Sequence, residues 1–586
     1  MKKRILSALF LISALLLSSC AQAPTITEAG SNTQSIQPNA SYDALPVSEL
    51  FSDRDFATDY DAAQCVGIDL LETGSVTISQ EGCYLISGIL ADGAITVDAA
   101  KDSKIQLILN GVSITSSTGA PIYIRQADKV FITLAEGSEN RLANDGSFEA
   151  IDENNIDSVI FSKEDLTLNG AGSLTVISPA GHGIVSKDDL RITGGSYTVN
   201  ATGHGIAGKD AVSIAAGTFT IESDKDGIQA ENDEDTALGN IYICGGSFQI
   251  TASGDGISAG AAMQIDGGEY TVLCGGGSEY GEDHTDDMFG GGMGFGGHGG
   301  RPGGMGWGGS STETEDDSAV SAKGLKSAGP MTVNGGSFTI DSADDAVHSN
   351  HNLTVTGGSF TIATGDDGFH ADEALVIEDG TISISESYEG LEGLSISVNG
   401  GSITLKASDD GLNAAGGNDE SGFGGMGGRP GGMGGFGGDS FGASSDSFIA
   451  ISGGKLFVDA DGDGIDSNGD LTFSGGYTLV EGPTNGGNGP LDYGGNGSIS
   501  GGTILISGSS GMAQSLTATG TQGILAFTVG TCPAGTQILV FDSDGNTVLT
   551  VQPEKTFGCV IVSTPEIRKG QTYTVTLGDQ SAEFEA

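Results

Sequence analysis

The sequence predicts an all-β protein in which a parallel β-helix with rungs of about 22 residues is followed by a small β-sandwich-like domain. Glycine makes up 100 of 586 residues and aromatic residues only 6%, so the core must consist of small and β-branched side chains. A glycine pair recurs at intervals of 22 residues, as from Gly336 to Gly358. Polar and apolar residues then alternate, as in Ser337-Phe338-Thr339-Ile340, which is typical of a β-strand.

The repeat occupies residues 161–515. A unit with two or three short strands cannot bury its own apolar face, whereas stacked coils pair their strands about 4.8 Å apart. A β-propeller would need blades of roughly 40–45 residues, and a leucine-rich repeat would need its Leu/Asn pattern. Because neither pattern occurs, we expect the repeat to form a parallel β-helix. Its glycine pairs end at Gly195, Gly246, Gly268, Gly336, Gly358, Gly401, Gly454 and Gly476.

The regions around the repeat differ from it in pattern. Residues 43–160 are rich in strand-like segments without clear glycine anchors, and we expect irregular N-terminal coils and a cap there. Glycine-rich insertions at 275–315 and 418–446 interrupt the repeat and are interpreted as surface loops. Residues 516–586 contain short strands separated by turns, which predicts a small β domain covering the open end of the solenoid.

The N-terminus has the features of an export signal. Residues 1–4 carry three basic residues, and an apolar run follows that is too short to span a membrane permanently. The run ends in Leu17-Ser18-Ser19-Cys20, which resembles the bacterial lipobox, where the cysteine is acylated. We therefore expect a lipoprotein signal peptide over 1–20, lipidation of Cys20 and a flexible tether over 21–42. The mature chain would lie outside the cytoplasmic membrane, exposed at the cell surface, with this anchor as its only membrane contact.

The formal charge of −54 excludes whole classes of partner. Nucleic acids and anionic lipid surfaces are bound through Lys and Arg, which are scarce here. Metal cations are the natural counter-charge, and we expect a monomer. An exported protein also permits disulfides, and spacing favours the pairs Cys65–Cys83 and Cys532–Cys559.

An acidic turn residue recurs nine positions after most glycine pairs and forms a column along the stacked rungs. In several rungs another acid directly precedes the acidic turn residue, so the acids are doubled. A second column of polar residues follows three positions after the first. An apolar residue between the two columns must point inward, so the second column should point outward. The first column comprises Asp226, Asp255, Asp345, Asp367, Glu389, Asp410 and Asp463, with His204 in the same position earlier; the second comprises His348, His370, Glu392, Asn413 and Asp466.

Stacked carboxylates about 4.8 Å apart repel one another. Each neighbouring pair costs roughly 1 kcal/mol in water and about 3.5 kcal/mol at an effective dielectric near 20. Ca²⁺, a hard cation that prefers oxygen ligands, is the simplest compensation. The alternative is that each Asp-Gly only makes a turn, with its carboxylate capping backbone N–H groups; this explains single acids but not doubled ones.

A second pattern also indicates calcium. Asp459, Asp461 and Asp463, followed by Gly464 and by Asp470 at the twelfth position, have the spacing of a calcium loop with glycine at position six. The segment lacks flanking helices and a final Glu, so it is not an EF-hand.

Several long strings resemble a family of bacterial cell-surface carbohydrate-binding proteins. They include DDAVHSNHNLTVTGGSFTI (344–362), DDGFHADEALVIEDGTISI (366–384) and ASDDGLNAAGG (407–417). The resemblance covers roughly 80–510 and implies a right-handed parallel β-helix similar to pectate lyases, with calcium sites. It implies binding of acidic plant polysaccharide such as polygalacturonate (pectin), and also of cellulose. Carried over by position, the calcium ligands would be Asp344, Asp345, Asp366, Asp367, Asp409 and Asp410.

Binding and catalysis remain alternatives at this point. A uronate lyase needs a cation to neutralise the substrate carboxylate and a base to take the α-proton, and Lys323 is the candidate base. The alternative role for Lys323 is a simple salt bridge to Asp345. We favour a calcium-dependent carbohydrate-binding protein over a lyase or a structural adhesion protein. The residues expected to contact sugar hydroxyls are His348, His370, Glu389, Glu392 and Asn413.

Overall fold

The computed structural model describes residues 50–149, 154–281, 321–414 and 447–586, all of which belong to one compact unit, Tyr42–Ala586. The signal peptide, the tether and Cys20 lie outside the described residues, as do 418–446 and the part of the first insertion after Gly281. Apart from Leu50 at the start of the described ranges, helix there is limited to α2 (Leu70–Thr73) and the 3₁₀ turn η1 (Ser278–Tyr280). Neither of these is a helix that could cross a membrane.

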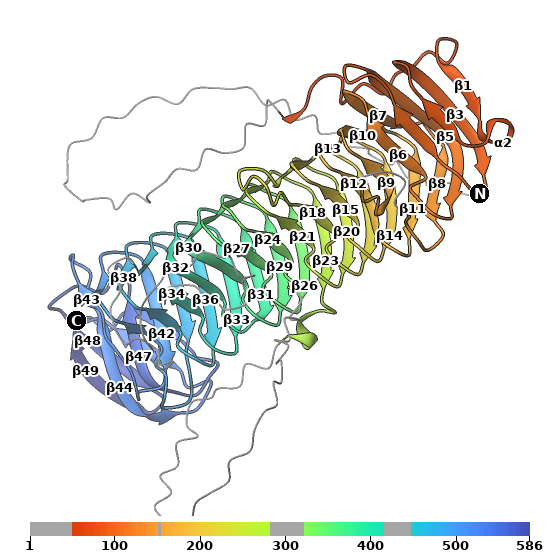
Figure 1. Ribbon diagram of the computed structural model, residues 1–586. Helices are drawn as coiled ribbons and strands as arrows, with labels where there is room; N and C mark the ends of the chain where they lie inside the picture. The colour runs from red at the N-terminus through yellow and green to blue at the C-terminus, as the bar shows by residue number, and fades with distance from the viewer. Residues whose placement is uncertain (1–49, 150–153, 282–320, 415–446) are drawn as a thin grey trace, which may run out of the picture. The chain divides into compact units, whose positions relative to one another are not determined.

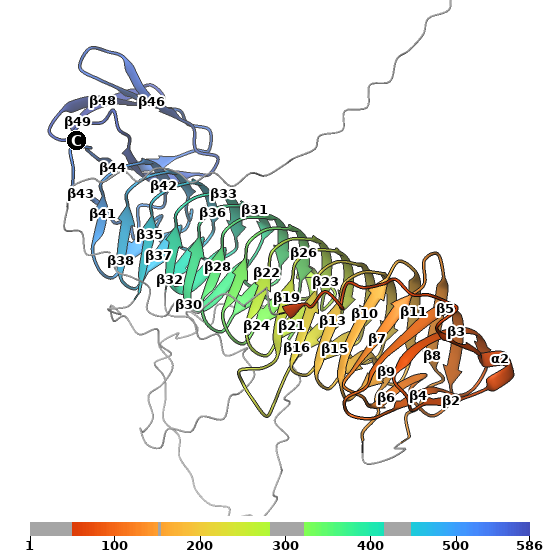
Figure 2. The ribbon, with the colours of Figure 1, turned by 90° about the horizontal axis from the view of Figure 1, so that it is seen from above.

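The predicted parallel β-helix is confirmed (Figures 1 and 2). Each rung contributes strands to three columns, and each strand pairs in parallel with the equivalent strand of the next rung. In β26 and β29, Phe338 lies opposite Phe360, a separation of one 22-residue repeat. The strict register follows from the glycine anchors, because Gly336 and Gly358 adopt positive φ angles of 115° and 106° at equivalent turns.

The first column contains the longer strands. These are β8 (Glu139–Asn144), β11 (Ser173–Ser178), β14 (Ser196–Ala201), β17 (Thr218–Ser223), β20 (Ser247–Ala252), β23 (Glu269–Cys274), β26 (Ser337–Ser342), β29 (Ser359–Thr364), β31 (Thr381–Glu386), β33 (Ser402–Ala407), β36 (Lys455–Ala460), β39 (Tyr477–Glu481) and β42 (Thr503–Gly508).

The second column follows the acidic turns. Its strands are β9 (Ser158–Ser162), β12 (His182–Ser186), β15 (Ile206–Gly208), β18 (Ile228–Ala230), β21 (Ile257–Ala259), β24 (Leu325–Ser327), β27 (Val347–Ser349), β30 (Phe369–Ile377), β32 (Leu391–Val398), β34 (Leu412–Ala414), β37 (Ile465–Ser467) and β40 (Asp492–Tyr493).

The third column completes each rung, and β30 and β32 extend into it. Its other strands are β7 (Lys129–Leu134), β10 (Asp165–Gly170), β13 (Asp189–Ile192), β16 (Ala211–Ile214), β19 (Asn240–Ile243), β22 (Met263–Ile265), β25 (Met331–Val333), β28 (Leu353–Val355), β35 (Phe448–Ile451), β38 (Asp470–Phe473), β41 (Gly497–Ile499) and β43 (Thr517–Ala518).

Parallel pairing begins much earlier in the chain than the glycine anchors predict. The first rungs belong to the same sheet as the repeat, so the region expected to form irregular coils already contains regular rungs. Their strands are β1 (Val66–Asp69), β2 (Val76–Ile78), β3 (Gly82–Leu90), β4 (Ile95–Asp98), β5 (Lys104–Ser116) and β6 (Ile122–Gln126). Cys65 and Cys83 form the predicted disulfide beside β1 and β3.

The C-terminal region forms the predicted small β structure. Strand β47 pairs antiparallel with β42 and with β44, while β46, β45, β48 and β49 form a separate antiparallel sheet. Strand β47 thereby covers the free edge of the last long strand. The bounds are β44 (Leu525–Cys532), β45 (Ile538–Phe541), β46 (Thr547–Val551), β47 (Phe557–Ser563), β48 (Thr572–Leu577) and β49 (Gln580–Glu585).

The expected Cys532–Cys559 disulfide is wrong, because both thiols are free. The antiparallel register places Cys559 opposite Thr528 and Cys532 opposite Phe557, so the two cysteines do not face each other. Cys559 is buried in the main core, whereas Cys532 is partly exposed at the end of its strand.

Inward-facing side chains stack along the solenoid. Six aromatic rings of the first column lie 4.5–5.3 Å apart between successive centroids, with interplanar angles of 2–13°. Because the rungs are in register, each ring packs face to face on the next, and all are buried. These rings are Tyr197, Phe219, Phe248, Tyr270, Phe338 and Phe360.

Candidate functional site

The acidic column lies in the turns that join the first column of strands to the second. One oxygen of each of several of these carboxylates accepts a hydrogen bond from the backbone N–H of the next rung. Asp345 Oδ1 accepts from Asp367 N at 3.0 Å, and Asp367 Oδ1 accepts from Glu389 N at 3.2 Å. Asp226 Oδ1 accepts from Asp255 N at 2.9 Å. The turn-capping interpretation therefore accounts for one oxygen per carboxylate and leaves the second for other partners.

Two histidines have the same capping role earlier in the column. His182 Nδ1 accepts from His204 N at 2.8 Å, and His204 Nδ1 accepts from Asp226 N at 3.2 Å. Burial, helped by repulsion from His204 and nearby lysines, lowers the pKa of His182 to about 4. A neutral imidazole can accept a hydrogen bond at Nδ1, so the lowered pKa and the contact agree.

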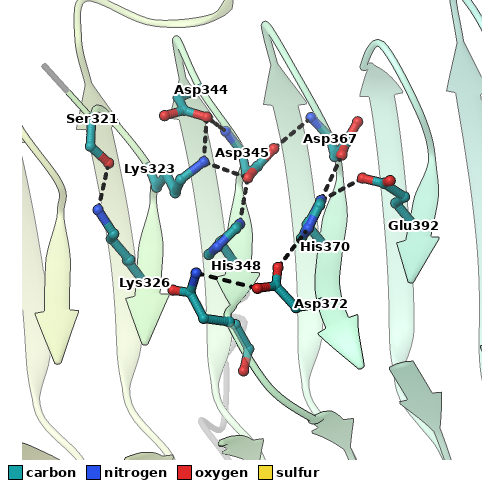
Figure 3. A network of polar contacts seen from close by, with 12 residues as sticks. Ser321, Lys323, Lys326, Asp344, Asp345, His348, Asp367, His370, Asp372 and Glu392 are labelled. Carbon is teal, nitrogen blue, oxygen red and sulfur yellow. Dashed lines mark hydrogen bonds and ion pairs between the residues drawn. The ribbon is translucent and has the colours of Figure 1, made fainter. Parts of the chain in front are cut away.

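Lys323 provides a positive charge inside the column (Figure 3). Its side chain has no exposed surface, and Nζ lies 2.6 Å from both Asp344 Oδ1 and Asp345 Oδ2. Burial alone would raise the pKa of Asp345, but Lys323 and His348 outweigh it and hold that pKa well below its usual range. Lys323 is thus a buried ammonium ion with no lone pair to accept a proton. Both ion pairs engage the amine that the lyase alternative takes as its base.

His370 provides a second positive charge, one rung further on. Nδ1 lies 3.0 Å from Asp367 Oδ2 and 2.5 Å from Glu392 Oε2, while Nε2 lies 3.2 Å from Asp372 Oδ1 (Figure 3). Burial disfavours the charged ring, but these three carboxylates outweigh it and raise the pKa of His370 far above its usual value. Its ring stacks on that of His348 at a centroid distance of 4.6 Å.

The outward column is more enclosed than the sequence suggested. His348 and His370 are completely buried, and Asn413 is only 9% exposed, much like Glu389 of the first column at 8%. Glu392 is half-buried. Opposite charges on neighbouring rungs draw these side chains together, so most of this column is engaged within the protein rather than presented to a ligand.

A third acidic cluster has a different character. Asp410, Asp463 and Asp466 each offer an oxygen within 4.8 Å of the others. Burial and neighbouring carboxylates raise the pKa of Asp463 to about 6 and that of Asp466 to about 7. Burial and the carboxylate of Asp409 also raise the pKa of Asp410 well above its usual range. Raised pKa values of this kind are typical of carboxylates that lack a neighbouring positive charge.

Two buried oxygens beside this cluster lack hydrogen-bond partners among the residues that the structure describes. They are Glu389 Oε2 and Asn413 Oδ1. Asn413 Nδ2 donates to Glu389 Oε1 at 2.7 Å, and Asn413 lies opposite Asp466 on the next rung. Glu389 is close enough to Asp410 for that carboxylate to raise its pKa. An oxygen-only donor set with unsatisfied oxygens fits a hard cation such as Ca²⁺.

The other predicted calcium ligands have other contacts. Asp344, Asp345 and Asp366 also cluster within 4.8 Å, but Lys323 already bonds two of them. Asp367 bonds His370.

The predicted loop of 459–470 does not converge on one point. Asp459 and Asp461 contact Lys555 Nζ at 2.5 and 2.9 Å, Asp463 accepts from Gly489 N at 2.5 Å, and Asp470 accepts from Asn496 N at 2.8 Å. Asp459 lies in β36, Asp461 and Asp463 in the turn before β37, and Asp470 in β38, so the three sides of one rung separate these residues and they do not form a compact loop.

The sequence left a salt bridge from Lys323 to Asp345 as an alternative, which the structure bears out, and gave no indication of Asp372. Lys323 occupies the acidic position of its own rung, since its backbone N–H donates to Asp255 Oδ1 at 2.9 Å just as the acids do. A lysine in that position was the available signal for a built-in counter-charge. Asp372 follows His370 by two residues, but nothing in its spacing distinguished it from other surface acids.

Three comparisons with known proteins each found a match. A family model described as carbohydrate-binding domain-containing protein matches residues 72–368. A protein of the same description from Acetivibrio thermocellus is 34% identical over 201 residues, which cover 34% of this chain and 65% of that protein, slightly less than two thirds of its length. A solved structure of a polysaccharide lyase-like protein from C. thermocellum is 38% identical, with a TM-score of 0.34, and the match covers 34% of this chain and 82% of that one.

The family model spans just over half of the 586 residues, including the rungs of Asp344, Asp345 and Asp367. The chain belongs to the family of carbohydrate-binding domain-containing proteins.

Proposed function

We propose that this protein binds an acidic plant polysaccharide, polygalacturonate (pectin) in particular and also cellulose, with the help of a calcium ion. The observation that carries the proposal is the oxygen-only cluster of Asp410, Asp463 and Asp466, to which none of the residues that the structure describes supplies a positive charge. In the mature protein, Cys20 would carry the lipid that holds the chain at the bacterial cell surface.

A cation resolves the electrostatic difficulty of the proposal. A chain with a formal charge of −54 repels polyuronates unless a positive charge lies between them. When bound, Ca²⁺ supplies that charge together with coordination positions for sugar carboxylates, because it takes six to eight oxygen ligands in flexible geometry. Asp410, Asp463 and Asp466 would hold it, and Glu389 Oε2 and Asn413 Oδ1 are the nearby oxygens available to complete the set.

The proposed calcium site is therefore confined to the later part of the acidic column. At Asp344 and Asp345 the ammonium of Lys323 already balances the charge, and at Asp367 the imidazolium of His370 does so. These contacts argue against a separate ion at every doubled acid. They also argue against the lyase alternative, whose candidate base is Lys323.

The proposal is tested by affinity electrophoresis of the mature chain in polygalacturonate gels, with calcium or with chelator. We expect retardation with calcium, release with chelator and loss of retardation in the double variant Asp463→Asn/Asp466→Asn. The matched control Asp224→Asn/Asp233→Asn removes the same charge from two exposed positions and should bind normally. Calcium-independent binding, or equal binding by both double variants, would refute the calcium mechanism.

A pull-down on microcrystalline cellulose tests the second ligand under the same conditions. Because cellulose carries no carboxylates, we expect its binding to depend less on calcium than polygalacturonate binding does. Appearance of an unsaturated uronate product would instead identify the protein as a lyase.

A further inference from the structure

A short loop lies across the rungs next to the acidic turns. It starts where β23 ends, with Gly275, Gly276 and Gly277 at φ angles of 61°, 92° and 97°, and continues into η1. Ser278 N donates to Asp341 Oδ1 at 2.7 Å, which ties the loop to the next rung, that of β26. A methyl group built on Gly281 would lie 2.5 Å from Gly365 Cα, so the loop also packs against the rung of β29.

This packing places the loop immediately beside two residues of the acidic column. The same methyl group on Gly281 would lie 3.0 Å from the carbonyl oxygen of Ala343. Ala343 and Gly365 directly precede Asp344 and Asp366 in the chain. Residues 275–281 therefore border the turns that carry the doubled acids.

The ring of Tyr280 is supported on one face. A methyl group built on Gly276 would lie 3.0 Å from Tyr280 Cδ2 and 3.3 Å from both of the ring neighbours of that atom, Cε2 and Cγ. A point beyond the ring edge would lie much farther from these two neighbours than from Cδ2, so distances of only 3.3 Å place the methyl group above Cδ2, on the face of the ring. Gly276 thus packs beneath the ring and has no side chain that would displace it.

The opposite face is open in the part of the chain that the structure describes. Tyr280 is 72% exposed, and among the large exposed apolar side chains there it alone lies beside the turns of Asp344 and Asp366. The others are Phe56 and Tyr60 in the segment before β1, Val66, Leu71 and Ile89 in the first rungs, and Met512 near the C-terminal end of the solenoid. Single exposed apolar residues are ordinary in proteins, so the preformed support and the location distinguish Tyr280.

We infer that Tyr280 is a further carbohydrate-binding residue whose open ring face stacks on a pyranose ring of the bound polysaccharide. The inference rests on the proposed function and adds a contact that requires no cation. A pyranose presents a face of C–H groups that packs by dispersion on an aromatic ring, with its hydroxyls directed sideways. A ring that is already held in place loses little conformational freedom when the sugar binds.

The test compares Tyr280→Ala, Tyr280→Phe and Gly276→Ala with the wild-type chain by calorimetric titration of oligogalacturonate in calcium. Loss of one stacked ring should weaken binding about three- to tenfold in Tyr280→Ala. Tyr280→Phe retains the ring and should bind within about twofold of wild type. Gly276→Ala should weaken binding by displacing the ring. Tyr60→Ala is the matched control, because it removes an exposed tyrosine in the segment before β1.

The outcomes separate this inference from the function on which it rests. Titration of calcium alone should give the same affinity for wild type and for Tyr280→Ala. If wild type binds oligogalacturonate and Tyr280→Ala binds it equally well, the stacking role is wrong while the proposed function stands. If wild type does not bind, the proposed function is wrong and the stacking role falls with it. Equal weakening by Tyr60→Ala would also overturn the inference.

Discussion

At the scale of single residues, the acidic column is a series of charges compensated in different ways. Lys323 compensates Asp344 and Asp345, and His370 compensates Asp367. The capping oxygens are held by backbone N–H groups of the next rung. Each compensated position is a buried network whose stability depends on every partner being present.

Lys323→Met should therefore destabilise the protein by about 3–5 kcal/mol, because it leaves buried carboxylates without a counter-charge. Urea denaturation at pH 7 measures the loss. Lys326→Met is the control, since Lys326 Nζ is partly exposed and lies 3.4 Å from Asp255 Oδ2, and its loss should be smaller. A Lys323→Met variant as stable as wild type would contradict the buried-ammonium interpretation.

His182 predicts a dependence of stability on pH. Its pKa is about 4 in the folded protein and 6.5 in the unfolded chain, so between these values the unfolded chain binds more protons. The contribution is fully present above about pH 6.5 and is lost as the pH falls toward 4. Its side chain is 21% exposed, so we expect about 1–3 kcal/mol rather than the full value of the shift.

His182→Asn keeps an acceptor for His204 N but does not titrate. Unfolding free energies measured from pH 7 to pH 4 should fall less steeply for this variant than for wild type. Parallel profiles would show that His182 is not the titrating group. The variant must be compared with wild type, because carboxylates whose pKa is raised on folding, such as that of Asp463, make the folded protein more stable as the pH falls.

At the scale of elements, each rung depends on the rungs on either side of it. The aromatic stack illustrates this, because Phe338 lies between Tyr270 and Phe360 at centroid distances of 4.5 and 4.6 Å. The turn glycines permit the close approach: a methyl group on Gly336 would lie 3.0 Å from the ring of Phe338. A cavity in one rung therefore removes contacts from both neighbours.

Phe338→Ala should cost about 3–5 kcal/mol, the range for deletion of a buried phenylalanine. Phe457→Ala is the matched control, because Phe457 is only half-buried and outside the stack, and it should cost less. Thermal and urea unfolding of the two variants check the difference. Equal losses would mean that the stack contributes no more than an ordinary half-buried ring.

At the scale of the whole molecule, the charge of −54 opposes compaction. Buried ion pairs such as that of Lys323 are screened little, whereas exposed acids are screened by salt within a Debye length of about 10 Å at 0.1 M. Cations that bind only the folded state should add stability by mass action. Screening by salt and binding of a cation at a site can be separated, because only binding at a site depends on the particular side chains that coordinate the cation.

The melting temperature should rise between low and moderate NaCl, and Ca²⁺ at equal ionic strength should raise it further. Differential scanning fluorimetry measures both effects. The additional calcium shift should disappear in Asp463→Asn/Asp466→Asn but persist in Asp224→Asn/Asp233→Asn. A calcium shift that matches NaCl at equal ionic strength would contradict specific binding.

The 22-residue period and the alternation after each glycine pair were sufficient to predict the parallel β-helix. Both are local patterns that every rung repeats, as the register of Phe338 and Phe360 confirms. The acidic turns were predicted for the same reason, since Asp345 and Asp367 occupy equivalent positions one repeat apart.

Only the tertiary structure decided which charges meet. Lys323 reaches Asp344 and Asp345 across a rung, and Lys555 reaches Asp459 from the C-terminal region. Whether Cys532 and Cys559 face each other depends on the register of the antiparallel strands β44 and β47, and no sequence repeat fixes that register. Periodicity fixes the positions of equivalent residues, but the direction of a long side chain depends on which neighbours exclude water from it and satisfy its charge.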